Sequence, residues 1–180
     1  ARMAMAALGV EPCALVPGPS GAPTWPSGVV GSMTHCAGYR AAAVARSTDI
    51  ATLGIDAEPH EPLPAGMLRR VGCGSEQGHL AQLAADFPAI CWDRVLFSAK
   101  ESVYKAWFLL TRRWLGFDET ELTFDPVNGR FEVALLNGLP EGVDPLRIHG
   151  LWAISDDFIA TAVTGSFRRR STTVTDEGNY

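Results

Sequence analysis

Apolar and β-branched residues gather in short runs in the first third of the chain, and Gly, Pro or polar residues bound each run. Runs of this kind are typical of buried strands. They predict strands at 29–35 (VVGSMTH) and 50–58 (IATLGIDAE), and a strand or short helix at 39–45 (YRAAAVA). The Pro- and Gly-rich residues 11–28 predict an irregular surface segment that Trp25 anchors in the core.

The middle of the chain changes to a helical period. Residues 75–87 (SEQGHLAQLAADF) predict one helix, with Ser75 as its N-cap. A longer helix is predicted from about Ile90 to Leu115, ended by Gly116. Its apolar stripe predicts a buried face of Leu96, Ala99, Val103, Ala106, Trp107, Leu110 and Trp114. The opposite stripe is polar and carries Arg94, Ser98, Glu101, Lys105 and Arg112.

Two β-hairpins are predicted after the long helix. The first, 121–136 (ELTFDPVNGRFEVALL), turns at Asn128-Gly129. The second, 151–167 (LWAISDDFIATAVTGSF), turns at Asp156-Asp157. Strands, then helices, then hairpins predict an α+β fold rather than a regular β-α-β winding.

Composition narrows the class of protein. A chain of 180 residues with 47% hydrophobic and 19% charged residues is long enough for one domain or two small lobes. The net charge of -5 argues against a nucleic-acid or membrane partner, since both recruit basic surfaces. No apolar run is long enough to cross a bilayer, and the first residues lack a signal-peptide pattern. Scattered cysteines without CxxC spacing predict reduced thiols in the cytoplasm, and no zinc site, for Cys13, Cys36, Cys73 and Cys91.

Asp56 and Glu58 stand two residues apart where the strand at 50–58 ends. Side chains alternate along a strand, so both carboxylates lie on the same face. Like charges this close repel unless they are solvated or a cation or Arg lies between them. A solvated strand end is the simplest interpretation of this stretch by itself.

A second polar group lies in the long helix, within residues 97–107 (FSAKESVYKAW). Glu101 and Lys105 are neighbours on one helix face, and a surface ion pair of a few tenths of a kcal/mol is the simplest explanation. If this face packs near the strand end, Glu101 can join Asp56 and Glu58 around one Mg²⁺, which prefers oxygen ligands. Lysines beside such a site suit group transfer at a pyrophosphate.

Thr34 and His35 end the first predicted strand. A lone His in such a position is more often structural or solvated than catalytic. Beside an anionic substrate, however, its ring N–H and the Thr hydroxyl could bind a phosphate.

Three separated blocks resemble one known family. They are WPSGVVGSMTHCAGYRAAAVA (25–45), LGIDAE (53–58) and LFSAKESVYKAW with RRWLGF (96–117). Together, in this order, they resemble the 4′-phosphopantetheinyl transferases of the surfactin-synthetase-activating type, in particular the actinobacterial and enterobactin-type branch. The likeness covers most of residues 1–167, whereas either acidic block alone would be a weak signal.

The resemblance implies an enzyme activity. Members of this family, also called holo-[acyl-carrier-protein] synthases, move the phosphopantetheine arm of coenzyme A to a serine of an apo acyl or peptidyl carrier protein. The other product is adenosine 3′,5′-bisphosphate. By resemblance, Asp56, Glu58 and Glu101 ligate Mg²⁺, or Mn²⁺ in its place. Glu101, directly or through a water, is the candidate base for the carrier serine.

The resemblance also implies contacts to coenzyme A. Lys105 would stabilise the pyrophosphate in the transition state, and Lys100 would bind coenzyme A phosphates. His35 would contact the 3′-phosphate, with Thr34 beside it. Relatives often carry a Lys or Arg near position 20, where this chain has Ser20. Another base, such as Arg40, could replace it.

For the fold, the resemblance implies a pseudo-two-fold pair of α/β lobes with the active site between them. Residues 1–49 would form the first lobe, incomplete at its N-terminus, because residues 1–9 (ARMAMAALG) resemble the second half of a helix. Residues 50–167 would form the second lobe with the metal site, and 168–180 a flexible tail. Two lobes in one chain imply a monomer.

Two other functions stay open at this stage. The same carboxylates would serve a Mg²⁺-dependent phosphohydrolase of a nucleotide or of coenzyme A, and a non-catalytic coenzyme A-binding module would show similar patterns. For the transferase, length and blocks favour a broad secondary-metabolism enzyme over the short trimeric fatty-acid type. They leave open whether its carrier serves fatty-acid, polyketide, nonribosomal peptide or siderophore assembly. Arginines in two exposed pairs could dock an acidic carrier: Arg69, Arg70, Arg112 and Arg113.

Overall fold

A computed structural model describes residues 1–18, 21–138, 146–155 and 157–167 of the chain. The fold is α+β, as predicted. Its elements, in chain order, are α1 (Arg2–Ala7), β1 (Val29–Cys36), β2 (Tyr39–Arg46), β3 (Thr52–Pro59), α2 (Leu68–Val71), α3 (Gly74–Asp86), α4 (Trp92–Thr111), the short 3₁₀ helix η2 (Phe117–Glu119), β4 (Thr120–Asp125), β5 (Arg130–Leu135), β6 (Leu146–Ile154) and β7 (Phe158–Phe167).

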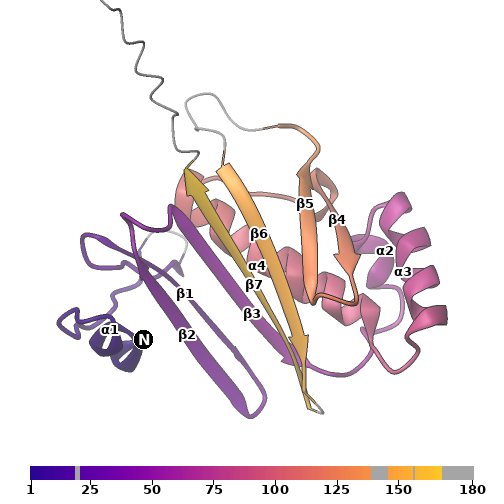
Figure 1. Cartoon of the computed structure of the whole chain (residues 1–180), viewed down its shortest axis with the longest axis horizontal. Helices are drawn as coiled ribbons and strands as arrows, with labels where there is room; N and C mark the ends of the chain where they lie inside the picture. Colours follow the sequence, from indigo (N-terminus) through magenta and orange to yellow (C-terminus); the bar gives the residue numbers. More distant parts are fainter. Residues whose placement is uncertain (19–20, 139–145, 156, 168–180) are drawn as a thin grey trace, which may run out of the picture.

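The strands form two antiparallel sheets. β1 and β2 make a two-stranded sheet, so the segment left open as strand or helix is a strand. The other five strands pair in the order β3-β7-β6-β5-β4. The β1–β2 hairpin lies beside β3, at the opposite end of the molecule from α2 and α3, and α4 crosses one face of the larger sheet (Figure 1). Both predicted hairpins after α4 are therefore confirmed.

Side chains join the two sheets at the seam between β1 and β3. The Ile55 backbone N–H donates to Ser32 Oγ at 3.0 Å, and the Ala57 N–H donates to Thr34 Oγ1 at 3.1 Å. Hydroxyl groups thus accept bonds that a neighbouring strand's carbonyls would accept within a sheet. The contact between the two sheets consequently depends on the Ser32 and Thr34 side chains of β1.

Helix α4 is shorter than its pattern predicted. It ends at Thr111, where Arg112 takes a left-handed conformation, and Gly116 instead precedes η2. The predicted stripe is buried at Leu96, Ala99, Val103 and Ala106, but Trp114 lies beyond the helix and is 76% exposed. The helix ends at an Arg in the left-handed conformation, a position where Gly is usual. The predicted helix was therefore too long at its C-terminal end.

A second face of α4 is also buried, against β3 and β7. Ser98 and Ser102 are fully buried, and their hydroxyls lie 3.0 and 2.7 Å from the Thr161 hydroxyl on β7. At Gly54 on β3, an added Cβ would lie 2.0 Å from the Ser102 carbonyl oxygen. The backbones of the helix and the strand are therefore in direct contact. The prediction that Ser98 lies on the polar face opposite the core is wrong, because Ser98 is buried.

Smaller differences concern caps and turns. The N-cap of α3 is Cys73 rather than Ser75, and the Cys73 N–H donates to the Glu76 carboxylate at 2.8 Å. In the β4–β5 turn, Gly129 takes a positive φ of 62°, while Asn128 is bound by the Asp125 side chain.

Some predictions concern residues that the structure does not describe. The turn residue Asp156 and the tail at 168–180 lie outside the described residues. None of the helices in the described ranges combines the length and hydropathy needed to span a bilayer.

Candidate functional site

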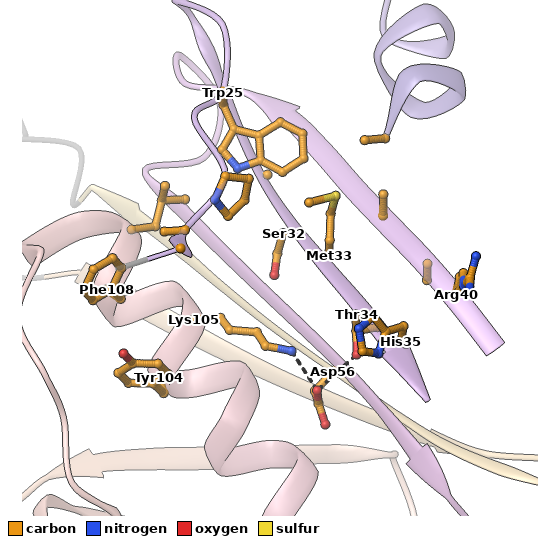
Figure 2. A pocket seen from close by; sticks show the side chains of 18 of the residues that line it. Trp25, Ser32, Met33, Thr34, His35, Arg40, Asp56, Tyr104, Lys105 and Phe108 are labelled. Atoms are coloured by element: carbon orange, nitrogen blue, oxygen red, sulfur yellow. Dashed lines mark hydrogen bonds and ion pairs between the residues drawn. The ribbon is translucent and has the colours of Figure 1, made fainter. Parts of the chain in front are cut away.

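A cavity of about 700 Å³ lies between the β1–β2 hairpin and the C-terminal half of α4. Lys105 reaches from α4 toward Asp56, while His35 and Arg40 lie across the cavity on β1 and β2 (Figure 2). Much of the remaining wall is apolar or aromatic, and includes Trp25, Met33, Tyr104, Phe108 and Leu109. Both sheets and the long helix therefore contribute to one site.

Asp56 is the most buried of the predicted acidic residues, at 6% exposed. Its Oδ1 lies 2.7 Å from Lys105 Nζ and accepts a 3.1 Å hydrogen bond from Thr34 Oγ1. Its Oδ2 is buried and has no hydrogen-bond partner. Buried carboxylate oxygens are nearly always satisfied in proteins, so Oδ2 is an acceptor open to a cation, a water or a ligand.

Glu58, near the end of β3, is bound by Arg94 near the start of α4. Its Oε2 lies 2.9 Å from Arg94 Nη1, and the same guanidinium donates to the carbonyl oxygens of Glu61 and Pro62 at 2.9 and 3.0 Å. Burial and the charge of Asp56 raise the pKa of Glu58, against the opposing effect of Arg94. The sequence analysis missed this role of Arg94, although an Arg between the two carboxylates was one of the arrangements that tolerate such a pair.

Glu101 is half-buried on the α4 face that looks toward β3. Burial first, and then the charge of Asp56, raise the pKa of Glu101, while Lys105 acts in the opposite direction. Glu58 also contributes to this rise, so the three carboxylates are electrostatic neighbours. In this structure, however, the three side chains do not surround one common position. Within the described ranges, no three His, Cys, Asp or Glu side chains lie close enough to hold one ion.

The structure does not bring Lys100 into the cavity. Lys100 is 2% exposed, and its Nζ forms a 2.8 Å ion pair with the buried carboxylate of Glu76. Two carbonyl oxygens, of Phe117 and Thr120, accept its remaining bonds at 2.6 and 2.9 Å. All three donors of the ammonium are therefore used inside the protein, and the expectation that Lys100 contacts coenzyme A phosphates is not supported.

Thr34 and His35 both line the cavity, but their side chains differ in contacts and exposure. The Thr34 hydroxyl is committed to Asp56 and to the β3 backbone. His35 is exposed and pairs across the hairpin with Arg40, so an imidazole and a guanidinium share one end of the cavity. Ser20, where relatives often carry a base, lies outside the described residues.

Comparison with known proteins gives two family matches. Residues 1–45 match the 4′-phosphopantetheinyl transferase N-terminal domain, and residues 52–160 match the 4′-phosphopantetheinyl transferase superfamily. The first match covers the β1–β2 hairpin, and the second covers β3 and α4.

Individual relatives are similar along most of the chain. The 4′-phosphopantetheinyl transferase Svp of Streptomyces mobaraensis is 54% identical over 166 residues, which cover 91% of this chain and 67% of the relative. The transferase PptT of Mycobacterium tuberculosis is 44% identical, over 91% of this chain and 74% of the relative. The transferase Npt of Nocardia iowensis is 48% identical, over 91% of this chain and 77% of the relative.

Proposed function

This chain belongs to the 4′-phosphopantetheinyl transferase superfamily, and we propose that it transfers the 4′-phosphopantetheine arm of coenzyme A to a serine of an apo acyl or peptidyl carrier protein. One observation carries the proposal beyond the family match. Lys105 pairs with Asp56 at the wall of a cavity that both sheets line, and the charges of both residues act on the pKa of Glu101. A cation and carboxylates at such a place suit displacement at a pyrophosphate.

Coenzyme A is proposed to lie in this cavity with its phosphates toward the cationic groups. Lys105 is proposed to stabilise negative charge that develops on the pyrophosphate. His35 and Arg40, at the β1–β2 end, are proposed to bind the 3′-phosphate, with Arg40 acting where relatives use a base near position 20. The apolar wall suits the less polar parts of the coenzyme.

The donor set fits Mg²⁺, or Mn²⁺ in its place. Three carboxylates are electrostatic neighbours, and Asp56 Oδ2 is a buried oxygen without a partner. Oxygen ligands of this kind are those that Mg²⁺ prefers, together with water and substrate phosphates. The three carboxylates do not lie close enough to hold one ion in this structure, so Asp56, Glu58 and Glu101 are proposed to hold it after their side chains move together. The bound ion would supply charge neutralisation at the pyrophosphate.

The chain's own residues would then perform the following transfer. The carrier serine Oγ attacks the phosphorus that bears the pantetheine arm, and its proton passes to a Glu101 carboxylate oxygen, directly or through a water. The bond from that phosphorus to the bridging oxygen breaks, and adenosine 3′,5′-bisphosphate leaves. Lys105 stabilises the negative charge on the phosphates, and Thr34 keeps Asp56 oriented through its 3.1 Å hydrogen bond.

A mass measurement tests the proposal. Purified protein, coenzyme A, Mg²⁺ and an apo carrier should yield a carrier heavier by one phosphopantetheine group, together with one adenosine 3′,5′-bisphosphate. Glu101→Gln should abolish the mass gain without abolishing folding, as judged by circular dichroism. Coenzyme A fragments released without carrier modification would support a phosphohydrolase instead. Coenzyme A binding without any turnover would support a non-catalytic binding module.

We also propose that the protein acts as a monomer in the cytoplasm, with lobes at 1–49 and 50–167. The cavity draws its walls from both proposed lobes of one chain, which supports a monomer. All four cysteines are free thiols, which suits a reducing compartment. Light scattering on the purified protein tests the monomer, because a trimer would indicate that neighbouring chains complete the site.

A further inference from the structure

Arg112 has an unusual backbone conformation. It directly follows the last residue of α4, with φ 56° and ψ 23°, and no other non-glycine residue in the described ranges has a positive φ. This left-handed region costs free energy for a residue with a Cβ, and helix ends in this conformation usually carry Gly or Asn. The Arg112 backbone N–H donates to the Phe108 carbonyl oxygen at 3.0 Å, a bond that any non-proline residue at this position could make, so the presence of an Arg here points to a role of its side chain outside the helix cap.

The conformation brings the Arg112 side chain to the cavity. Its guanidinium carbon lies 5.9 Å from the centre of the Phe108 ring, and both residues line the cavity wall. The side chain is exposed and forms no ion pair with any described residue. Its planar set of donors therefore stays available to an anion in the cavity.

The neighbouring Arg113 provides a contrast within the same segment. It is also exposed, but it does not line the cavity, and its N–H donates to Thr111 Oγ1 at 3.1 Å. Of two consecutive arginines, the one in the strained conformation is thus the one that reaches the cavity.

The position of Arg112 relative to Lys105 suits a long ligand with several charges. The two residues are seven positions apart on α4 and its cap, which is about two turns and about 10 Å along the axis. Lys105 is already paired with Asp56, whereas Arg112 forms no ion pair within the part of the chain that the structure describes. Coenzyme A carries a pyrophosphate and a separate 3′-phosphate, so one molecule can present anionic groups at both positions.

We propose that Arg112 is a coenzyme A-binding residue that contacts a phosphate of the coenzyme, and that this contact explains a strained Arg at the end of α4. This inference rests on the proposed function and deepens it. It gives Arg112 a role other than docking an acidic carrier, the role that its sequence suggests together with Arg113.

The test separates helix capping from binding. Arg112→Gly suits the left-handed conformation, so its melting temperature should rise by about 2–4 °C, while the dissociation constant for coenzyme A, measured by calorimetry without carrier, should increase about 10-fold. Arg112→Asn, which tolerates the same backbone conformation, should weaken binding similarly and serves if the Gly variant folds poorly. Arg113→Gly is the matched control and should leave coenzyme A affinity unchanged.

Each result has a distinct meaning. Dephospho-coenzyme A, which lacks the 3′-phosphate, locates the contact. If the Arg112→Gly effect disappears with this probe, Arg112 contacts the 3′-phosphate, and the assignment of that phosphate to His35 and Arg40 must be revised. If the effect persists, Arg112 contacts the pyrophosphate. Unchanged coenzyme A affinity in both Arg112 variants overturns the inference, and an increased KM for the carrier alone would assign Arg112 to carrier docking. Failure of the unmodified protein to bind coenzyme A would instead overturn the proposed function.

Discussion

Arg94, in the first turn of α4, holds Glu58, at the end of β3, through an ion pair of 2.9 Å. The same guanidinium binds two carbonyl oxygens of the loop that follows β3. One side chain therefore fixes the strand end, the loop and the helix start relative to each other.

Replacing Arg94 should destabilise this junction. Arg94→Ala leaves Glu58 without its cationic partner and two carbonyl oxygens without a donor, so we expect a loss of about 1–3 kcal/mol in the free energy of unfolding. Urea denaturation followed by circular dichroism measures it. Arg70→Ala, at an exposed position, is the control and should change stability by less than about 0.5 kcal/mol. Equal stability of the two variants would show that the Arg94 contacts contribute nothing.

Removing Lys100 should destabilise the protein more severely. Lys100→Met leaves the Glu76 carboxylate buried without its cation, a change that typically costs about 3–5 kcal/mol. The double variant Lys100→Met/Glu76→Gln removes both charges and should recover part of this loss, measured by urea denaturation. The double variant should also bind coenzyme A as the unmodified protein does. A selective loss of coenzyme A affinity in a stable double variant would restore the role expected from the sequence.

Glu101 should limit stability above acidic pH. Burial and Asp56 raise the pKa of Glu101 in the folded protein, so the unfolded chain loses this proton first as pH rises. The free energy of unfolding therefore falls as pH increases from the unfolded pKa through the raised folded value. In metal-free buffer, Glu101→Gln should be more stable than the parent near pH 7 and about equally stable below pH of about 4.

Urea titrations at both pH values check the Glu101 prediction. Glu61→Gln, at an exposed loop position, should show no such difference. A Glu101→Gln variant no more stable than the parent near neutral pH would contradict it.

Gly54 and Gly78 should respond in opposite ways to the same substitution. Gly54→Ala places a Cβ 2.0 Å from the Ser102 carbonyl oxygen, so strand and helix must move apart, at a cost of about 3 kcal/mol or more. Gly78→Ala fills open space in α3 and should stabilise the protein by about 0.5–1 kcal/mol. Thermal unfolding of both variants compares them, and a Gly54→Ala variant as stable as the parent would rule out the close contact.

Local patterns predicted most of the fold. Short apolar and β-branched runs located β1 and β3, and the turn at Asn128-Gly129 located the β4–β5 hairpin. The end of α4 was not predictable by the same rules, because Arg112 adopts a conformation that favours Gly. The buried face at Ser98 was also missed, since hydroxyl groups read as polar even when a partner such as Thr161 satisfies them inside the protein.

The acidic residues of the candidate site were easier to predict from the sequence than its lysines. Spacing brought Asp56, Glu58 and Glu101 to attention, and the structure places them as electrostatic neighbours. Lys100 has the same chemistry as Lys105, and only the tertiary structure shows that the first faces Glu76 while the second faces Asp56. Positions five residues apart on a helix point in different directions, but sequence does not reveal which direction meets a buried carboxylate.

The contact between Gly54 and the backbone of α4 has a consequence for divergence within the family. Peptide groups, which every sequence shares, set the separation of this strand and helix, so exchanges among the surrounding large apolar residues leave the spacing of the carboxylates unchanged. Directed-evolution libraries that vary the core around α4 and keep Gly54 fixed should therefore alter heat tolerance far more often than turnover.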